Sequence, residues 1–233
     1  MRDHGKVIGP SIADNKSLLT KLIQQEPMLF GAEAKFADKQ GGPLTDLALL
    51  ALENIGVDRT DLLVDTRSHM LKPGWFPAIP GWHCDEVPRG KDGQPDLSLI
   101  PEDPKDRPNH YLIVLDAGTC AMTHFYPTSD RNLRGDGIIW EGMKLHKEDA
   151  NPQSTVWGHC DRLIRKWAFP CEIEPTLSGH LYEFDQFDFH TATSAKLDGW
   201  RWFFRATTKS KRPVANEIRR QVQVYLGNEN GGW

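Results

Sequence analysis

Apolar residues follow a helical spacing in the first sixty positions of the chain. The segment from Ser17 to Ile23 has this spacing and stops near Pro27. Residues 43–55 carry a broader apolar face, and Gly56 follows them as a helix stop signal. We therefore expect residues 1–60 to form a helical N-terminal segment.

From residue 61 onward the apolar positions form short continuous or alternating runs, separated by turns that contain Pro and Gly. Such runs are typical of buried or half-buried strands. The expected strands are 62–71, 111–115, 121–126, 137–140, 180–184, 200–207 and 221–226. This order predicts a mainly β fold with N-terminal helices, and specifically a double-stranded β-helix, or jelly roll. We expect one domain over residues 1–233, with the β core in 61–233.

One long polar segment interrupts the predicted strands. Residues 88–108 are rich in Pro, Asp, Lys and Gly, which makes them too polar for a core and too long for a plain turn. They are predicted to form either a lid over a functional site or a loop without a function of its own.

Composition excludes several classes of protein. Lys plus Arg is 28 and Asp plus Glu is 32, a net charge of −4, which argues against tight non-specific binding of nucleic acid. A local basic surface at 209–212 and 219–220 is the exception, although a solvated terminal face is the favoured explanation for it. No apolar run approaches the roughly 18 residues of a membrane-spanning helix. The four cysteines are widely spaced, without a Cys-x-x-Cys pair. We expect a cytoplasmic protein.

Two histidines and one aspartate are the strongest candidates for chemistry. His83 and Asp85 are two residues apart, so in an extended segment both side chains point to the same face. His190, far along the chain, can complete the set. Two imidazoles and one carboxylate occupy one face of an octahedral metal and leave positions open, as a non-haem Fe(II) that binds a co-substrate and oxygen requires.

The same local pattern occurs a second time, at His159 and Asp161. We do not expect this pair to bind the metal, because residues 162–167 have the character of a short helix for which Asp161 is a suitable N-cap. Only 29 residues also separate Asp161 from His190, too few for the intervening strands of a barrel, whereas Asp85 precedes His190 by 105 residues.

Two arginines follow the last candidate ligand. Arg201 and Arg205 share one face of an aromatic-rich predicted strand, and a buried guanidinium needs an anionic partner. The planar fork of an Arg suits a carboxylate. A dicarboxylate co-substrate and an anionic substrate would satisfy both arginines. Alternatively, one or both arginines pair with protein carboxylates such as Asp185 or Asp188, or lie on the outer face of the strand.

Together these residues resemble the Fe(II)/2-oxoglutarate-dependent oxygenases. Lys72-Pro73-Gly74 leading into Trp82-His83-Cys84-Asp85 is similar to the motif of the phytanoyl-CoA hydroxylase-like branch. Arg201, eleven residues after His190 and followed by Arg205-Ala206-Thr207, is similar to the taurine dioxygenase-like branch. The resemblance covers residues 62–208 and does not extend to the first sixty.

The resemblance implies a role for each of these positions. His83, Asp85 and His190 would bind iron, and Arg201 would hold the distal carboxylate of 2-oxoglutarate. A threonine, Thr123 or Thr119, would assist it. Arg205 would help to bind the co-substrate or would contact an anionic group of the substrate.

The implied activity is that of a dioxygenase that uses Fe(II), 2-oxoglutarate and O2, hydroxylates a small molecule and releases succinate and CO2. Three alternatives stay open: a nucleic-acid base hydroxylase, a cupin-type metal enzyme that does not use 2-oxoglutarate, and a non-catalytic jelly roll. Trp75 and Trp82 are candidates for an aromatic wall that contacts the substrate, although simple core packing also accounts for them. The oligomeric state is not indicated.

Overall fold

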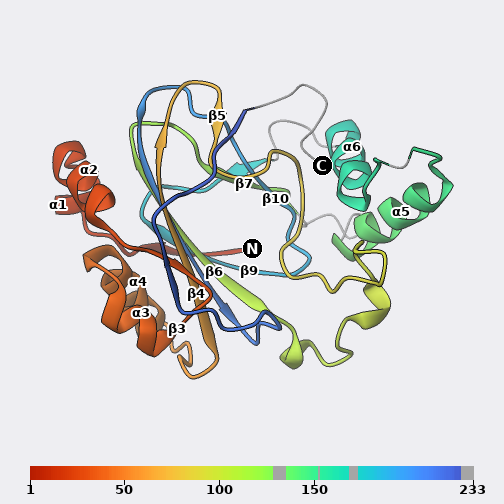
Figure 1. Cartoon of the computed structure of the whole chain (residues 1–233), viewed down its shortest axis with the longest axis horizontal. Coiled ribbons are helices and arrows are strands. Elements are labelled where there is room, and N and C mark those ends of the chain that lie inside the picture. Colours follow the sequence, from red (N-terminus) through yellow and green to blue (C-terminus); the bar gives the residue numbers. More distant parts are fainter. Residues whose placement is uncertain (128–134, 152, 168–172, 227–233) are drawn as a thin grey trace.

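An antiparallel sheet of six strands forms the centre of the computed structural model, which describes residues 1–127, 135–151, 153–167 and 173–226 (Figure 1). The strands lie in the order β1-β9-β6-β11-β4-β3. Their bounds are β1 Arg2–Lys6, β3 Ala32–Glu33, β4 Leu62–Leu71, β6 Asn109–Ala117, β9 His180–Asp185 and β11 Gly199–Thr208.

Three smaller sets of strands accompany the large sheet. A three-stranded sheet has the order β10-β7-β8, and two further pairs are β12-β2 and β13-β5. Their bounds are β2 Met28–Phe30, β5 Trp75–Phe76, β7 Thr123–Phe125, β8 Glu174–Pro175, β10 His190–Ala192, β12 Glu217–Arg219 and β13 Tyr225–Leu226. Buried residues of β6 and β9 pack with Phe125 of β7, which joins the large sheet to the three-stranded one.

The helices cover two sides of this β structure (Figure 1). Four precede β4: α1 Pro10–Ala13, α2 Lys16–Gln25, α3 Ala34–Gln40 and α4 Pro43–Asn54. Their buried residues share one apolar cluster with the outer face of the large sheet. Two more, α5 Gly135–Glu148 and α6 Val156–Trp167, pack on each other and on the segment around Trp82.

The alternation of β11 gives the large sheet its two chemically different faces. Trp202, Phe204 and Ala206 are fully buried against the helices. Arg201, Phe203 and Arg205 point to the opposite face, because side chains alternate along a strand. The strand is central, paired with β4 on one side and β6 on the other, so this inner row is fixed on both edges.

The pattern of the sequence predicted most of these elements. The strand expected at 62–71 has those bounds in the structure, and β6, β7, β9, β11, α2 and α4 lie at the expected places. The N-terminal sixty residues contain the expected helices but also β1, β2 and β3, two of which belong to the large sheet. The fold is therefore mainly sheet with helices, as expected.

Three local predictions were wrong. The strand expected at 137–140 lies inside α5, where Ile138 and Ile139 pack on α6, because so short an apolar run does not distinguish a strand from a helix. Helix α6 begins before Asp161, and the Thr155 hydroxyl caps it by accepting from the Gly158 N–H. Of residues 221–226, only Tyr225 and Leu226 form a strand.

The predicted lid contains two 3-10 helices, η1 Leu97–Leu99 and η2 Pro104–Asp106. Leu97 packs against the cluster of α5 and α6, and the Gln94 side chain accepts a hydrogen bond from the first residue of α6. Its function as a lid stays a prediction. No helix in the described ranges combines the length and the apolar character that crossing a membrane requires.

Candidate metal centre and its cavity

The structure brings His83, Asp85 and His190 together as a group that can hold a metal ion. Their ligand atoms all lie within 4.8 Å of one another. His190 begins β10, and His83 joins it through an isolated antiparallel bridge, with backbone hydrogen bonds of 2.9 and 3.1 Å in the two directions. Asp85 Oδ2 lies 3.5 Å from His190 Nε2. The bridge fixes two segments that are distant in the sequence against each other.

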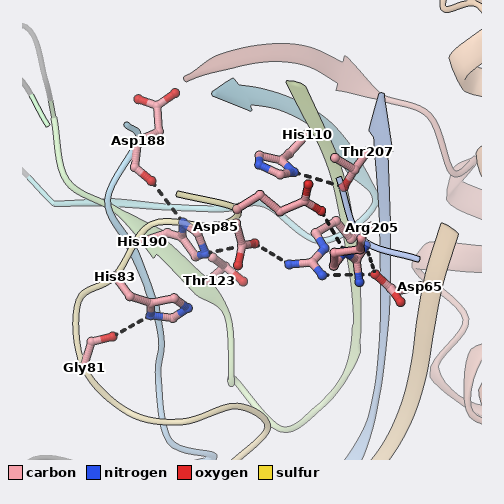
Figure 2. Close-up of polar contacts among 12 residues, drawn as sticks. Asp65, Gly81, His83, Asp85, His110, Thr123, Asp188, His190, Arg205 and Thr207 are labelled. Carbon is pink, nitrogen blue, oxygen red and sulfur yellow. Dashed lines mark hydrogen bonds and ion pairs between the residues drawn. The ribbon is translucent and has the colours of Figure 1, made fainter. Parts of the chain in front are cut away.

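Both histidines are oriented by a backbone carbonyl two residues earlier. His83 Nδ1 donates to the Gly81 carbonyl and His190 Nδ1 donates to the Asp188 carbonyl, each at 3.0 Å (Figure 2). A proton on Nδ1 puts the lone pair on Nε2, which is the usual way in which a neutral imidazole is prepared for a metal. Burial, followed by the neighbouring His190, lowers the pKa of His83 to about 4, which favours this neutral form.

Arg205 connects the Asp85 carboxylate to a second carboxylate. Its guanidinium donates to Asp85 Oδ2 and, at 3.0 Å, to Asp65 Oδ2 (Figure 2). Arg212 donates to Asp65 and to Glu86, at 2.7 Å each. The charge of Arg205 is thus balanced by two protein carboxylates, neither of which is Asp185 or Asp188.

This network keeps the carboxylates ionised. Burial by itself raises the pKa of Asp85, but Arg205 and then His190 outweigh burial and hold it well below its usual range. Burial also opposes ionisation of Asp65, yet Arg205 and Arg212 lower its pKa to about 2. Opposite charges held nearby favour the charged form.

Arg201 is 2% exposed and has a different environment. Its Nε donates to the Ala121 carbonyl at 2.7 Å and its Nη2 to the Thr123 hydroxyl at 3.3 Å. Within the described ranges, it forms no ion pair with a carboxylate. Burial lowers the pKa of Arg201 to about 10 against the attraction of Asp116, and repulsion by Arg67 adds to the decrease.

The two threonines named by the sequence are placed differently. Thr123, at the start of β7, lines the cavity beside Arg201. Thr119 is buried away from the cavity, where its hydroxyl donates to Asp116 and accepts from the Ala121 N–H.

One cavity of about 210 Å³ contains the metal candidates and Arg201. Its wall combines ionisable side chains with apolar ones. The apolar part comes from Leu112, Phe184 and Phe203 of the large sheet and from residues 77–79. A concave site in which polar groups can orient a ligand against an apolar wall is compatible with binding of a small molecule.

The structure places neither predicted tryptophan in this wall. Trp82 is buried against Tyr126, with ring centroids 6.2 Å apart, in the cluster of α5 and α6. Trp75 packs near Leu71 and Ala195 and contacts the Lys72 ammonium. No residue of 88–108 lines this cavity either.

The second His-x-Asp pattern supports the first one instead of competing with it. His159 and Asp161 lie on α6, where residues two apart point in different directions. Asp161 Oδ1 accepts a 3.0 Å hydrogen bond from the backbone N–H of Trp82, the residue before His83.

Two inward-facing residues of β4 escaped the sequence analysis. Arg67 and His69 follow Asp65 at alternate positions, and all three point to the inner face. Arg67 and His69 line the cavity. The sequence did contain a pattern that could have identified them. Three ionisable residues at i, i+2 and i+4 lie on one face of an otherwise apolar strand, which is unusual for a strand in a core.

Comparison with known proteins gives distant structural similarities. No protein-family model matches the sequence, and no curated protein does. HygX from Streptomyces hygroscopicus with nickel and 2-oxoglutarate bound is 16% identical, with a TM-score of 0.47 over 90% of this chain and 82% of that one.

Two other solved structures are similar to a comparable degree. EvdO2 from Micromonospora carbonacea var. aurantiaca complexed with 2-oxoglutarate is 15% identical, with a TM-score of 0.39 over 84% of this chain and 71% of that one. The non-heme monooxygenase ThoJ in its nickel complex is 11% identical, with a TM-score of 0.40 over 98% of this chain and 80% of that one.

Proposed function

We propose that this chain is an Fe(II)/2-oxoglutarate-dependent dioxygenase that hydroxylates a small molecule, with its sheets forming a double-stranded β-helix. One observation carries the proposal. The buried Arg201, without a carboxylate partner in the described part of the chain, lines the same cavity as His83, Asp85 and His190. A metal triad and an unpaired guanidinium in one cavity suit a metal-bound dicarboxylate.

The donor set fits iron. His83 and His190 each present Nε2, and Asp85 presents a carboxylate that its neighbours keep ionised. Two imidazoles and one carboxylate with open positions are typical of non-haem Fe(II) oxygenases. The Asp ligand also distinguishes the site from a halogenase, in which a small residue usually stands at this position.

Arg201 would hold the distal carboxylate of 2-oxoglutarate. Its Nε is committed to the Ala121 carbonyl, which fixes the plane of the guanidinium, and Thr123 lies beside Nη2. A bidentate arginine is well suited to a carboxylate. A cupin-type enzyme without 2-oxoglutarate has no need of this residue, so Arg201 favours the 2-oxoglutarate enzyme.

When bound, iron, 2-oxoglutarate and O2 supply the oxidising chemistry, with succinate and CO2 as co-products. The chain itself positions the reactants and limits access of water. Leu112, Phe184 and Phe203 give the cavity its apolar wall. A volume of about 210 Å³ is below the roughly 300–1,000 Å³ of sites for drug-sized ligands, which favours a small substrate.

The proposal is tested by adding Fe(II) and 2-oxoglutarate to the protein without oxygen. We expect a visible charge-transfer band in the wild type, its loss in His83→Ala, and its retention in His159→Ala, which alters the matching residue of the second His-x-Asp. Arg201→Gln should weaken 2-oxoglutarate binding while iron still binds. A folded wild-type protein without the band, or a band that persists in His83→Ala, would refute the proposal.

A further inference from the structure

Arg67 is a second guanidinium of the cavity that lacks a carboxylate partner. It lies on β4 opposite Phe203 of β11. Arg67 is two residues after Asp65, so both side chains point to the inner face of the sheet. Within the described residues it forms no hydrogen bond through its side chain and no ion pair. Its guanidinium lies over the ring of Phe203, with 5.8 Å between the guanidinium carbon and the ring centroid.

Arg201 contacts the same ring at the same distance, 5.8 Å. The two arginines thus flank Phe203 along the inner face. Burial and then repulsion by Arg205 lower the pKa of Arg67, and they outweigh the attraction of Asp65, Tyr225 and Asp85. Neither carboxylate forms an ion pair with Arg67, and a half-buried cation without a paired counter-charge is costly, so a guanidinium that faces a cavity in this state indicates an anionic ligand.

The other charges of the cavity are already balanced. Arg205 lines the cavity, but its guanidinium is already paired with Asp85 and Asp65 (Figure 2). The oxygens of Asp65 accept from Arg205, Arg212 and the Gly31 N–H, which leaves this carboxylate fully engaged.

A bound metal ion and 2-oxoglutarate do not supply a negative counter-charge for Arg67 either. If Fe(II) with Asp85 binds 2-oxoglutarate against Arg201, two positive charges of the metal and one of Arg201 meet one negative charge of Asp85 and two of the co-substrate. That sum is zero. Arg67 has no ion-pair partner in this set.

We propose that Arg67 binds an oxyanion of the primary substrate, which makes the substrate a small organic anion. The inference rests on the proposed function, because it takes Arg201 as the partner of the co-substrate. Carboxylate and phosphate or sulfate groups share the required chemistry, since each offers oxygens to the planar fork of an arginine.

A second cavity adjoins Arg67 and can receive the rest of such a substrate. This cavity, of about 170 Å³, shares Arg67 and Tyr225 with the metal cavity. Gln221, Gln223 and Arg219 add polar groups to its wall. Arg67 therefore stands between the oxidising centre and a polar compartment, and the part of the substrate beyond the anion should carry hydrogen-bonding groups.

Anion binding is tested on the full chain loaded with Zn(II) and 2-oxoglutarate. Zn(II) accepts the same nitrogen and oxygen ligands and keeps the protein diamagnetic. With 15N-labelled arginine, the Nε–H signal of Arg67 is identified by its loss in Arg67→Gln or in Arg67→Lys. Sodium acetate and inorganic phosphate are the two probes, each titrated at constant ionic strength.

We expect a saturable shift of the Arg67 signal with at least one probe. A response to acetate alone indicates a carboxylate substrate, and one to phosphate alone indicates a tetrahedral oxyanion. Arg2→Gln, which removes the same charge from an exposed position on β1, should leave the shift unchanged. If neither probe moves the Arg67 signal, or if Arg205 responds in its place, the inference is wrong.

A separate measurement distinguishes this inference from the function on which it rests. The anaerobic Fe(II)/2-oxoglutarate band should persist in Arg67→Gln. Loss of the band in that variant would mean that Arg67 holds the co-substrate, which overturns the inference but not the oxygenase. A wild-type protein without the band would overturn the oxygenase, whatever the Arg67 signal shows.

Discussion

Arg205 donates a hydrogen bond to Asp85, the carboxylate of the candidate metal triad, and thereby ties that residue to the large sheet. Asp85 lies in an irregular segment after β5, whereas Arg205 lies on the central strand β11. The same guanidinium binds Asp65 on the neighbouring strand β4. Asp85, a candidate metal ligand in a loop, is thus positioned by residues of two strands. Residues that hydrogen-bond to metal ligands commonly orient them in this way.

Removing this support should weaken metal binding. We expect Arg205→Gln to lower the affinity for Fe(II) or Ni(II) by about 10–100-fold, the usual effect of losing a group that orients a metal ligand. Titration under anaerobic conditions measures it, with Arg2→Gln as the control for net charge. An affinity equal to that of the wild type would show that Asp85 is positioned without Arg205.

The hydrogen bond from the Trp82 N–H to Asp161 should support the metal site from the opposite side. Asp161→Ala leaves a buried backbone donor without its partner, which costs about 1–3 kcal/mol of folding stability. Asp161→Asn keeps an acceptor and should recover most of the loss. Denaturant unfolding and metal titration of both variants test this, and equal behaviour of Ala and Asn would contradict it.

Thr123 should contribute to co-substrate binding through its contact with Arg201. Thr123→Val keeps the shape but removes the hydroxyl, and we expect a several-fold rise in the 2-oxoglutarate concentration required, with iron affinity unchanged. Thr191→Val is the matched control, because Thr191 lies on β10 between two residues that line the cavity and does not line it. Similar effects of both substitutions would argue against a specific role for Thr123.

Asp65 should make the protein sensitive to acid over a defined range. Its folded pKa is about 2, against an ordinary value of 3.8, so its ion pairs stabilise the fold above pH 4. This contribution is lost as the pH falls from about 4 to about 2 and amounts to about 2 kcal/mol. Unfolding of the metal-free protein across this range should show a flatter pH dependence in Asp65→Asn. An unchanged slope would mean that Asp65 is not paired in solution.

Much of the fold was predictable because it depends on local patterns. The strand 62–71 alternates or clusters its apolar residues in the way that a strand between two layers requires, and its bounds were predicted correctly. Residues 137–140 were assigned wrongly because four apolar positions fit either a strand or a helix, and only packing against α6 decides between them. The capping of α6 by Thr155 is a local feature, and it was missed because Asp161 was expected to be the N-cap of the helix.

Some residues of the candidate site were predictable from the sequence and others were not. Sequence spacing singled out His83, Asp85, His190 and Arg201, and the structure gathers all four around one cavity. Sequence spacing did not identify the partners of Arg205, because Asp65 is 140 residues away and no local pattern connects the two. Arg67 was not identified, because the sequence does not show whether an arginine on a strand has a carboxylate partner.

The sequence by itself determined the candidates for binding a metal and a carboxylate, because donor chemistry and strand alternation are local properties. Only the tertiary structure decided which charges remain unbalanced. Pairing of β4 with β11 places Asp65 beside Arg205 and leaves Arg67 and Arg201 to face the cavity. Charge balance depends on distances across strands that lie far apart in the chain, and those distances exist only after folding.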